Sequence, residues 1–156
     1  MLMSDPASVN LSRTLYRIAR KYNTCVYSIS QSPNDFLQSA ASDAIITNAH
    51  VRWMLPLNEG HESLHRFHLA DHEIEAVRHL QMVKGHFSEC FIKSGEEGVV
   101  VRLWPSPLEY WLCTTNAEDW LCEKKVRTEH PDWETGEVLE YLAKHFPNGA
   151  TGGLPR

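Results

Sequence analysis

The chain has 156 residues, of which 42% are hydrophobic and 22% are charged. These values are those of an ordinary globular protein about one domain long, with enough chain to bury a core. The net charge of −5 argues against a protein that mainly coats nucleic acid, because phosphate contacts need a basic surface.

The sequence shows no sign of a membrane span, a leader peptide or a cysteine-based site. No apolar run approaches the ~18–20 residues that cross a bilayer, and the segment Met1–Pro6 is too short and polar for a signal peptide. The cysteines form no Cys-x-x-Cys pair, so we expect reduced thiols in a cytoplasmic protein. They are Cys25, Cys90, Cys113 and Cys122.

The first part of the chain predicts a helix, a strand and a second helix. After a disordered lead over residues 1–7, Ser8 or Asn10 caps a helix that runs to about Tyr22. Thr24–Ser30 is β-branched and aromatic, which predicts a buried strand. A turn follows at 32–35, and the next helix covers 36–42, or 36–49 if it continues.

The remainder predicts a strand, two short helices, a β-meander and two final helices. Val51–Leu57 reads as a strand, and helices are expected near 61–68 and 72–82. Three strands then follow in close succession, joined by short loops that favour antiparallel pairing. They are expected at Phe87–Lys93, Val99–Trp104 and Leu108–Thr114, with helices near 116–129 and 134–145 and a disordered tail over 149–156.

This order of elements predicts an α/β protein that lacks the first strands of a nucleotide-binding sheet. A helix–strand–helix–strand series followed by a meander is typical of the back half of an α/β sheet with antiparallel strands added at one edge. A complete nucleotide-binding fold begins with the phosphate-binding strand, and no segment of this sequence has that pattern.

Several segments, in order, resemble the C-terminal ATPase domain of TraC-type conjugative-transfer ATPases, members of the wider VirB-type family of type IV secretion motors. The similarity covers roughly residues 11–148. It implies a RecA-like fold, hexamers at the cytoplasmic base of a secretion channel, and ATP and Mg²⁺ as cofactors. The matching segments are Arg20–Asn23, Ser30–Ser32, Asn34–Phe36, Ala44–Asn48, Leu69–Glu73 and Lys84–Glu89.

The chain departs from that family in its nucleotide motifs. It has no Gly-x-x-x-x-Gly-Lys-Ser/Thr loop (Walker A), so no backbone cradle and no lysine for the phosphates. It also has no apolar strand that ends in Asp-Glu (Walker B) to hold magnesium. We therefore expect no cofactor and no ATP turnover in the isolated chain, and a role in an ATPase only as part of a larger assembly.

Gln31 is the first candidate site residue. As the polar residue at the end of a predicted strand, it could orient the attacking water or contact the γ-phosphate. It could equally be a polar strand terminator that starts the following turn.

Three arginines form the second candidate. Arg13, Arg17 and Arg20 recur at i, i+4 and i+7 on the first helix, and in the family context one of them could act in trans as an arginine finger. The alternative is a solvated basic face, which contributes little to stability.

A stripe of histidines is the third candidate. On one unbroken helix, residues at this spacing would share a face, and imidazoles at i and i+4 can bind metal. The segment 69–71 is expected to break the helix, so we predict no metal site and an exposed polar face. The stripe consists of His61, His65, His68, His72 and His79.

The resulting hypothesis is a C-terminal subdomain of a conjugative-transfer motor ATPase that supplies a sensor and a trans arginine. Its partners would be other motor subunits, including copies of itself, at the inner face of a membrane channel complex. The alternative is a stand-alone, non-catalytic interaction module that binds a motor or channel component. The net charge favours neither a direct nucleic-acid partner nor a nucleic-acid-binding function.

Overall fold

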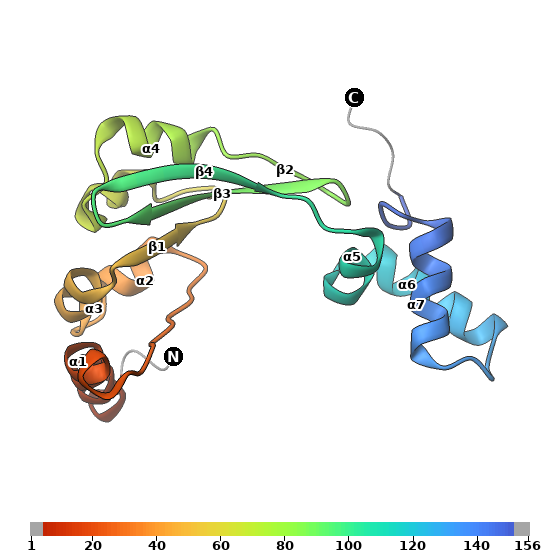
Figure 1. The fold of residues 1–156 in the computed structure, drawn as a ribbon, viewed down its shortest axis with the longest axis horizontal. Helices are drawn as coiled ribbons and strands as arrows, with labels where there is room; N and C mark the ends of the chain where they lie inside the picture. The colour runs from red at the N-terminus through yellow and green to blue at the C-terminus, as the bar shows by residue number, and fades with distance from the viewer. Residues whose placement is uncertain (1–4, 152–156) are drawn as a thin grey trace. The chain divides into compact units, whose positions relative to one another are not determined.

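The computed structural model describes residues 5–151 and shows a mixed α/β protein with a small antiparallel sheet (Figure 1). The chain divides into two compact units. The first comprises the residues up to Leu80 together with Cys90–Val101, and the second comprises Gln81–Glu89 together with the residues from Arg102 onward. The two long strands contribute residues to both units, and each unit is described separately.

The first unit opens with short capped helices. α1 (Pro6–Ile18) begins at Asp5, whose carboxylate accepts the amide N–H of Ser8 at 2.9 Å, and it continues as one 3₁₀ turn, η1 (Ala19–Tyr22). Ser32 caps α2 (Pro33–Leu37), and α3 (Ser42–Asn48) follows. α1 packs on α3 through a small apolar cluster of Val9, Ala41 and Ile45, with Tyr16 and Phe36 at its edge.

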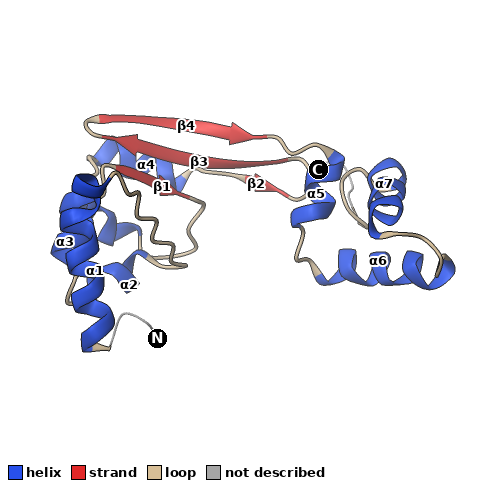
Figure 2. Cartoon of the chain, turned by 60° about the horizontal axis from the view of Figure 1, so that its bottom comes forward, coloured by secondary structure: helices blue, strands red, loops and turns tan. Residues whose placement is uncertain are grey.

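The sheet has the order β1-β3-β2, with β4 also paired to β3 (Figure 2). β1 (Val51–Met54) pairs antiparallel with β3 (Phe87–Ser94), in a register that places Trp53 opposite Ile92. β2 (Met82–Val83) pairs with the other end of β3, and β4 (Glu97–Leu103) follows a tight turn. Because side chains alternate along a strand, this register sends Met54 and Phe91 to one face and Trp53 to the other.

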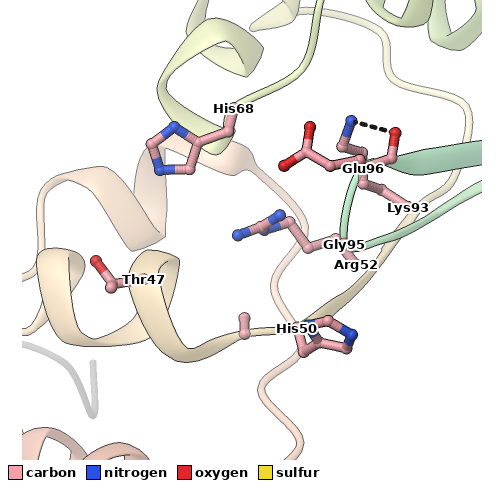
Figure 3. Close-up of a pocket in the computed structure, with 8 residues that line it drawn as sticks. Thr47, His50, Arg52, His68, Lys93, Gly95 and Glu96 are labelled. Atoms are coloured by element: carbon pink, nitrogen blue, oxygen red, sulfur yellow. Dashed lines mark hydrogen bonds between the residues drawn. The ribbon is translucent and has the colours of Figure 1, made fainter.

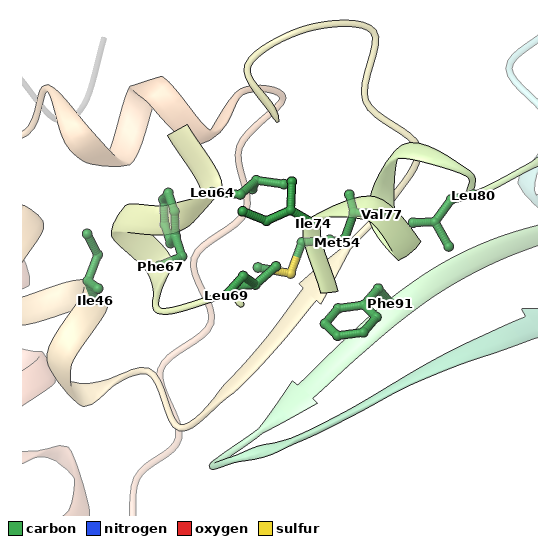
Figure 4. Packing of buried hydrophobic residues seen from close by; sticks show 9 residues of the cluster. All are labelled: Ile46, Met54, Leu64, Phe67, Leu69, Ile74, Val77, Leu80 and Phe91. Carbon is green, nitrogen blue, oxygen red and sulfur yellow. The ribbon is translucent and has the colours of Figure 1, made fainter. Parts of the chain in front are cut away.

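The principal core lies between the sheet and two short helices. η2 (His61–Phe67) and α4 (Asp71–Arg78) cover the face that carries Met54 and Phe91 (Figure 4). Burying apolar side chains of this size contributes roughly 1.5–3 kcal/mol each. The cluster consists of Ile46, Met54, Leu64, Phe67, Leu69, Ile74, Val77, Leu80 and Phe91.

The second unit is mainly helical. α5 (Pro107–Cys113), α6 (Ala117–Glu129) and α7 (Thr135–His145) surround a core of Trp111, Val126, Val138 and Leu142. The indole N–H of Trp111 donates to the carbonyl of Phe146 at 2.8 Å, which ties α5 to the end of α7. Asn116 caps α6, with its side-chain oxygen accepting the amides of Glu118 and Asp119.

A buried carboxylate joins the parts of this second unit. Asp119 is 0% exposed and accepts hydrogen bonds from Tyr110, Thr114 and the amide of Ala150, and Lys84 lies 3.2 Å away. Burial, the largest single influence, raises the pKa of Asp119, but these donors together outweigh it and hold the pKa below its ordinary value. Asp119 thus links α5, α6 and the residue that follows β2, Lys84, to Ala150.

The chain ends differ in part from the predicted boundaries. The first helix begins at Pro6, inside the predicted lead, and Gly149–Thr151 are held by hydrogen bonds, including one from Thr151 to Glu118. Residues 1–4 and 152–156, where the remainder of the predicted disorder falls, lie outside the described residues.

Two predicted strands are wrong. Leu108–Thr114 belongs to helix α5, because Ser106 and Glu109 form a reciprocal capping box and Pro107 occupies the first helical position. Thr24–Ser30 is extended but pairs with no strand in the described chain.

Three other elements end earlier than predicted. The predicted long helix over 36–49 is interrupted between α2 and α3, β1 stops at Met54, and α4 stops at Arg78. The other predicted strands and helices are present with shifted ends.

Candidate functional site

Gln31 directly follows the extended segment Thr24–Ser30, at the position predicted from the sequence. It is exposed, and its side chain makes no hydrogen bond to another residue of the described chain. The turn that follows is ordered: Ser30 donates to the carboxylate of Asp35, and the hydroxyl of Ser32 accepts the amide of Asn34 at 3.3 Å. Gln31 is therefore a free amide on a fixed turn.

The three arginines are not equivalent. Arg13 donates to the carbonyl of Ala40 at 2.6 Å, so it ties α1 to the residues before α3. The side chains of Arg17 and Arg20 are exposed and make no hydrogen bond or ion pair within residues 5–151. Since α1 gives way to a 3₁₀ turn at Ala19, Arg20 does not continue the α-helical face of the other two.

The histidine stripe is divided among several elements. His61 and His65 lie in η2, His72 lies in α4, and His68 and His79 stand at the C-caps of η2 and α4. Among the residues that the structure describes, no group of three or more histidine, cysteine or acidic side chains is placed to hold a metal ion.

His68 and five further polar or charged residues instead line a cavity in the first unit. It has a volume of about 220 Å³ and lies between the end of α3, β1, the C-cap of η2 and the β3–β4 turn (Figure 3). The guanidinium of Arg52 lies between the imidazoles of His50 and His68 in this view. The lining residues are Thr47, Ala49, His50, Arg52, His68, Lys93, Gly95 and Glu96.

Arg52 is a cation of this cavity with most of its hydrogen-bond donors unpaired. Its Nη2 donates to the carbonyl of Ile46 at 2.7 Å, whereas its Nε is buried and has no hydrogen-bond partner. Burial lowers the pKa of Arg52. No carboxylate of the described chain lies within ion-pair distance of it.

Lys93, in contrast, is fully engaged. Its Nζ lies 2.8 and 2.9 Å from the two carboxylate oxygens of Glu73 and 3.4 Å from the carbonyl of Glu96. Burial, the largest influence, raises the pKa of Glu73, but Lys93 and the amide of Ala70 outweigh it, so the pKa is lowered overall. The Nζ of Lys93 is therefore occupied by Glu73 and Glu96, and Arg52 and the two histidines are the cationic or basic groups still available in this cavity.

Sequence reasoning did not identify this cavity. Arg52 and Lys93 stand 41 positions apart, and only the β1–β3 register places them opposite each other. No local motif signals such a pair, because antiparallel register depends on how the whole sheet packs.

The cysteines form no disulfide in the described chain, and the tryptophans differ in their exposure. All four cysteines are free, and burial raises the pKa of the Cys90 thiol. Trp111 is buried in a core, but Trp53, Trp104 and Trp120 are 61%, 69% and 59% exposed. Trp111 is therefore a core residue of the second unit, and the exposed tryptophans remain available for an interface.

Comparison with known proteins found no matching family model, no similar curated protein and no similar solved structure. Within residues 5–151, no helix is long and apolar enough to cross a membrane.

Proposed function

We propose that this chain is the C-terminal subdomain of a RecA-like motor ATPase of the conjugative-transfer and type IV secretion class. In the assembled motor, Gln31 senses the γ-phosphate, and Arg17 or Arg20 reaches the nucleotide of a neighbouring subunit. Arg13 is the weakest of the three arginine candidates, because it already binds the carbonyl of Ala40.

The observation that carries this proposal is the state of Thr24–Ser30. Tyr27 and Ile29 are 87% and 95% exposed, and the backbone of Cys25–Ser30 makes no backbone hydrogen bond within the described chain. An extended segment with exposed apolar side chains, whose backbone groups have no partner in the described chain, is typical of a strand without its sheet. Central strands of parallel sheets are buried on both faces, which suits this composition.

The position of Gln31 supports the sensor role. In open α/β sheets, ligands bind at the carboxyl ends of the strands, and Gln31 follows the carboxyl end of this segment directly. Its free amide, on a turn fixed by Ser30, Asp35 and Ser32, suits a group that must point at a phosphate or a water molecule.

The nucleotide itself must be held elsewhere. ATP and Mg²⁺ need a phosphate-binding loop and an acidic strand end, and the printed sequence contains neither. We expect the purified chain neither to bind ATP tightly nor to hydrolyse it. Magnesium-dependent turnover by this 156-residue protein would refute the proposal.

The first test is to read the coding sequence next to that of this chain. A phosphate-binding loop and an Asp-Glu strand encoded in phase, or in a neighbouring gene whose product binds this chain, would support the proposal.

The second test is a variant of Gln31 in the ATPase that contains both this chain and the phosphate-binding loop. Gln31→Ala should lower kcat by about a hundredfold, comparable to the loss of one preorganised polar group in other active sites, with little change in nucleotide affinity. Gln38→Ala, also exposed and seven positions away, is the control and should leave kcat unchanged.

A second candidate function is a non-catalytic interaction module that binds a motor or channel component. It is favoured by the sheet face opposite α4, where Val51, Trp53 and Val99 are 50%, 61% and 55% exposed. Ile92 and Val99 also line a hollow of about 390 Å³ in this unit. An independent gene, with a partner lost on Trp53→Ser but retained on Gln31→Ala, would favour this function over the motor subdomain.

A further inference from the structure

The geometry around Arg52 points to a binding site for a small tetrahedral oxyanion, such as one phosphate group, in the cavity lined by His50, Arg52 and His68. None of the residues assigned to the motor function belongs to this site, so the inference stands apart from the proposed function.

The first reason is an uncompensated cation. A guanidinium carries five N–H donors, and Arg52 makes a single hydrogen bond, to the neutral carbonyl of Ile46. Its Nε is buried without a partner. A partly buried cation without a counter-charge is costly, and such groups in proteins are normally paired. The structure thus presents an arginine whose charge lacks the partner that partial burial requires.

The second reason is the set of donors that surrounds it. In the view of Figure 3 the guanidinium lies between the imidazoles of His50 and His68, and Thr47 also lines the cavity. His68 has a φ of 60°, which is uncommon for a residue with a side chain, and it lines the cavity at the C-cap of η2. Guanidinium, imidazole and hydroxyl groups are the donors that bind phosphate oxygens.

The third reason is size. A cavity of about 220 Å³ is below the roughly 300–1,000 Å³ that drug-sized ligands and cofactors occupy. It therefore suits a single anionic group rather than a whole nucleotide. Lys93 adds no donor, because its N–H groups are directed to Glu73 and to the carbonyl of Glu96.

The charges that face the cavity set the strength of binding. Arg52 is unpaired, the charge of Lys93 is balanced by Glu73, and the carboxylate of Glu96 lines the cavity and opposes an anion. Glu96 also supplies the competing explanation, in which its side chain swings onto Arg52 in solution. The two explanations differ in what they predict for the thermal stability of Glu96→Gln and for phosphate binding by the unchanged chain.

The experiment is a titration of the full chain with inorganic phosphate, sulfate and acetate at constant ionic strength, followed by amide and imidazole NMR shifts. We expect phosphate and sulfate to shift the signals of Thr47, His50, Arg52 and His68, and acetate to act more weakly. Shifts confined to other residues, or acetate binding as tightly as phosphate, would overturn the assignment.

Variants make the test sharper. Arg52→Gln should weaken phosphate binding about tenfold or more, as expected for the loss of a charge-assisted hydrogen bond. Arg66→Gln, on an exposed arginine of η2 outside the cavity, is the matched control and should bind as the unchanged chain does. Because Arg52 also binds Ile46, His68→Asn provides a second variant, since Asn tolerates a positive φ, and it should also weaken phosphate binding.

Glu96→Gln decides between the explanations. If the cavity binds an oxyanion, removing this like charge should tighten phosphate binding by about two- to fivefold. If Glu96 is the partner of Arg52 in solution, the variant should lose thermal stability, and phosphate should shift no signal of the cavity in the unchanged chain, which would overturn the proposal.

Discussion

The ammonium of Lys93 on β3 lies 2.8 Å from one carboxylate oxygen of Glu73 on α4 and 2.9 Å from the other. Both residues are 5% exposed, so the pair fastens the helix to the sheet inside the first unit. Glu73 also accepts the amide of Ala70 at 2.9 Å, which caps α4 at the same time.

Breaking this pair on one side should be strongly destabilising. We expect Glu73→Leu or Lys93→Met alone to lower the free energy of unfolding by about 3–5 kcal/mol, because each leaves an uncompensated buried charge. The double variant Glu73→Leu/Lys93→Met should lose much less than the sum of the two single changes. Urea denaturation of the four proteins measures this coupling, and strictly additive losses would contradict the pairing.

Asp119 should be equally critical in the second unit. Asp119→Asn keeps the size of the side chain but turns an amide N–H₂ toward donors and removes the charge that faces Lys84. We expect a loss of about 3 kcal/mol, the scale of a lost hydrogen bond to a buried charge. Asp132→Asn, on an exposed carboxylate, is the control and should stay within about 0.5 kcal/mol of the unchanged chain.

Stability should fall in acid. The pKa values of Asp119 and Glu73 are lowered in the folded chain, so folding favours their ionised forms. Their contribution is complete above the ordinary carboxyl pKa values of about 4, and it is lost as the pH falls through the lowered folded-state values. Denaturation followed between about pH 6 and pH 3 should show this decline. Asp119→Asn should flatten the decline, and an unchanged slope would contradict the role of Asp119.

Two glycines should respond in opposite directions to alanine. A Cβ at Gly98 would overlap Cζ of Phe91 and lie 2.6 Å from a carboxylate oxygen of Glu73, so Gly98→Ala should cost about 1–3 kcal/mol through overpacking. Gly136 in α7 has nothing within 4 Å of the same position, so Gly136→Ala should stabilise the chain by about 0.5–1 kcal/mol. Thermal unfolding of both variants measures the contrast, and an equal effect of the two changes would contradict it.

The unpaired segment Thr24–Ser30 should promote self-association at high concentration. Ile29→Lys should lower the association measured by sedimentation velocity, because a charge on an exposed strand discourages edge pairing. Leu11→Lys removes another apolar side chain, 60% exposed on α1, and serves as the matched control. If both changes act alike, association depends on general hydrophobicity rather than on strand pairing.

The sequence by itself determined most of the local structure. The helices α6 and α7 and the hairpin of β3 and β4 follow from local patterns: side-chain periodicity, an Asn cap and a Gly-containing turn. The capping box of Ser106 and Glu109 was also readable, and it outweighs the β-like composition of Leu108–Thr114, because capping supplies partners for the first backbone amides of a helix.

Only the tertiary structure decided which distant residues meet. The pairing of Glu73 with Lys93 and the cavity around Arg52 depend on the β1–β3 register and on the helix that covers it. Whether Thr24–Ser30 forms a strand also depends on the tertiary structure, because a strand needs a neighbouring strand for its backbone hydrogen bonds. Local propensity supplies the extended shape of that segment, and the described chain supplies no partner for it.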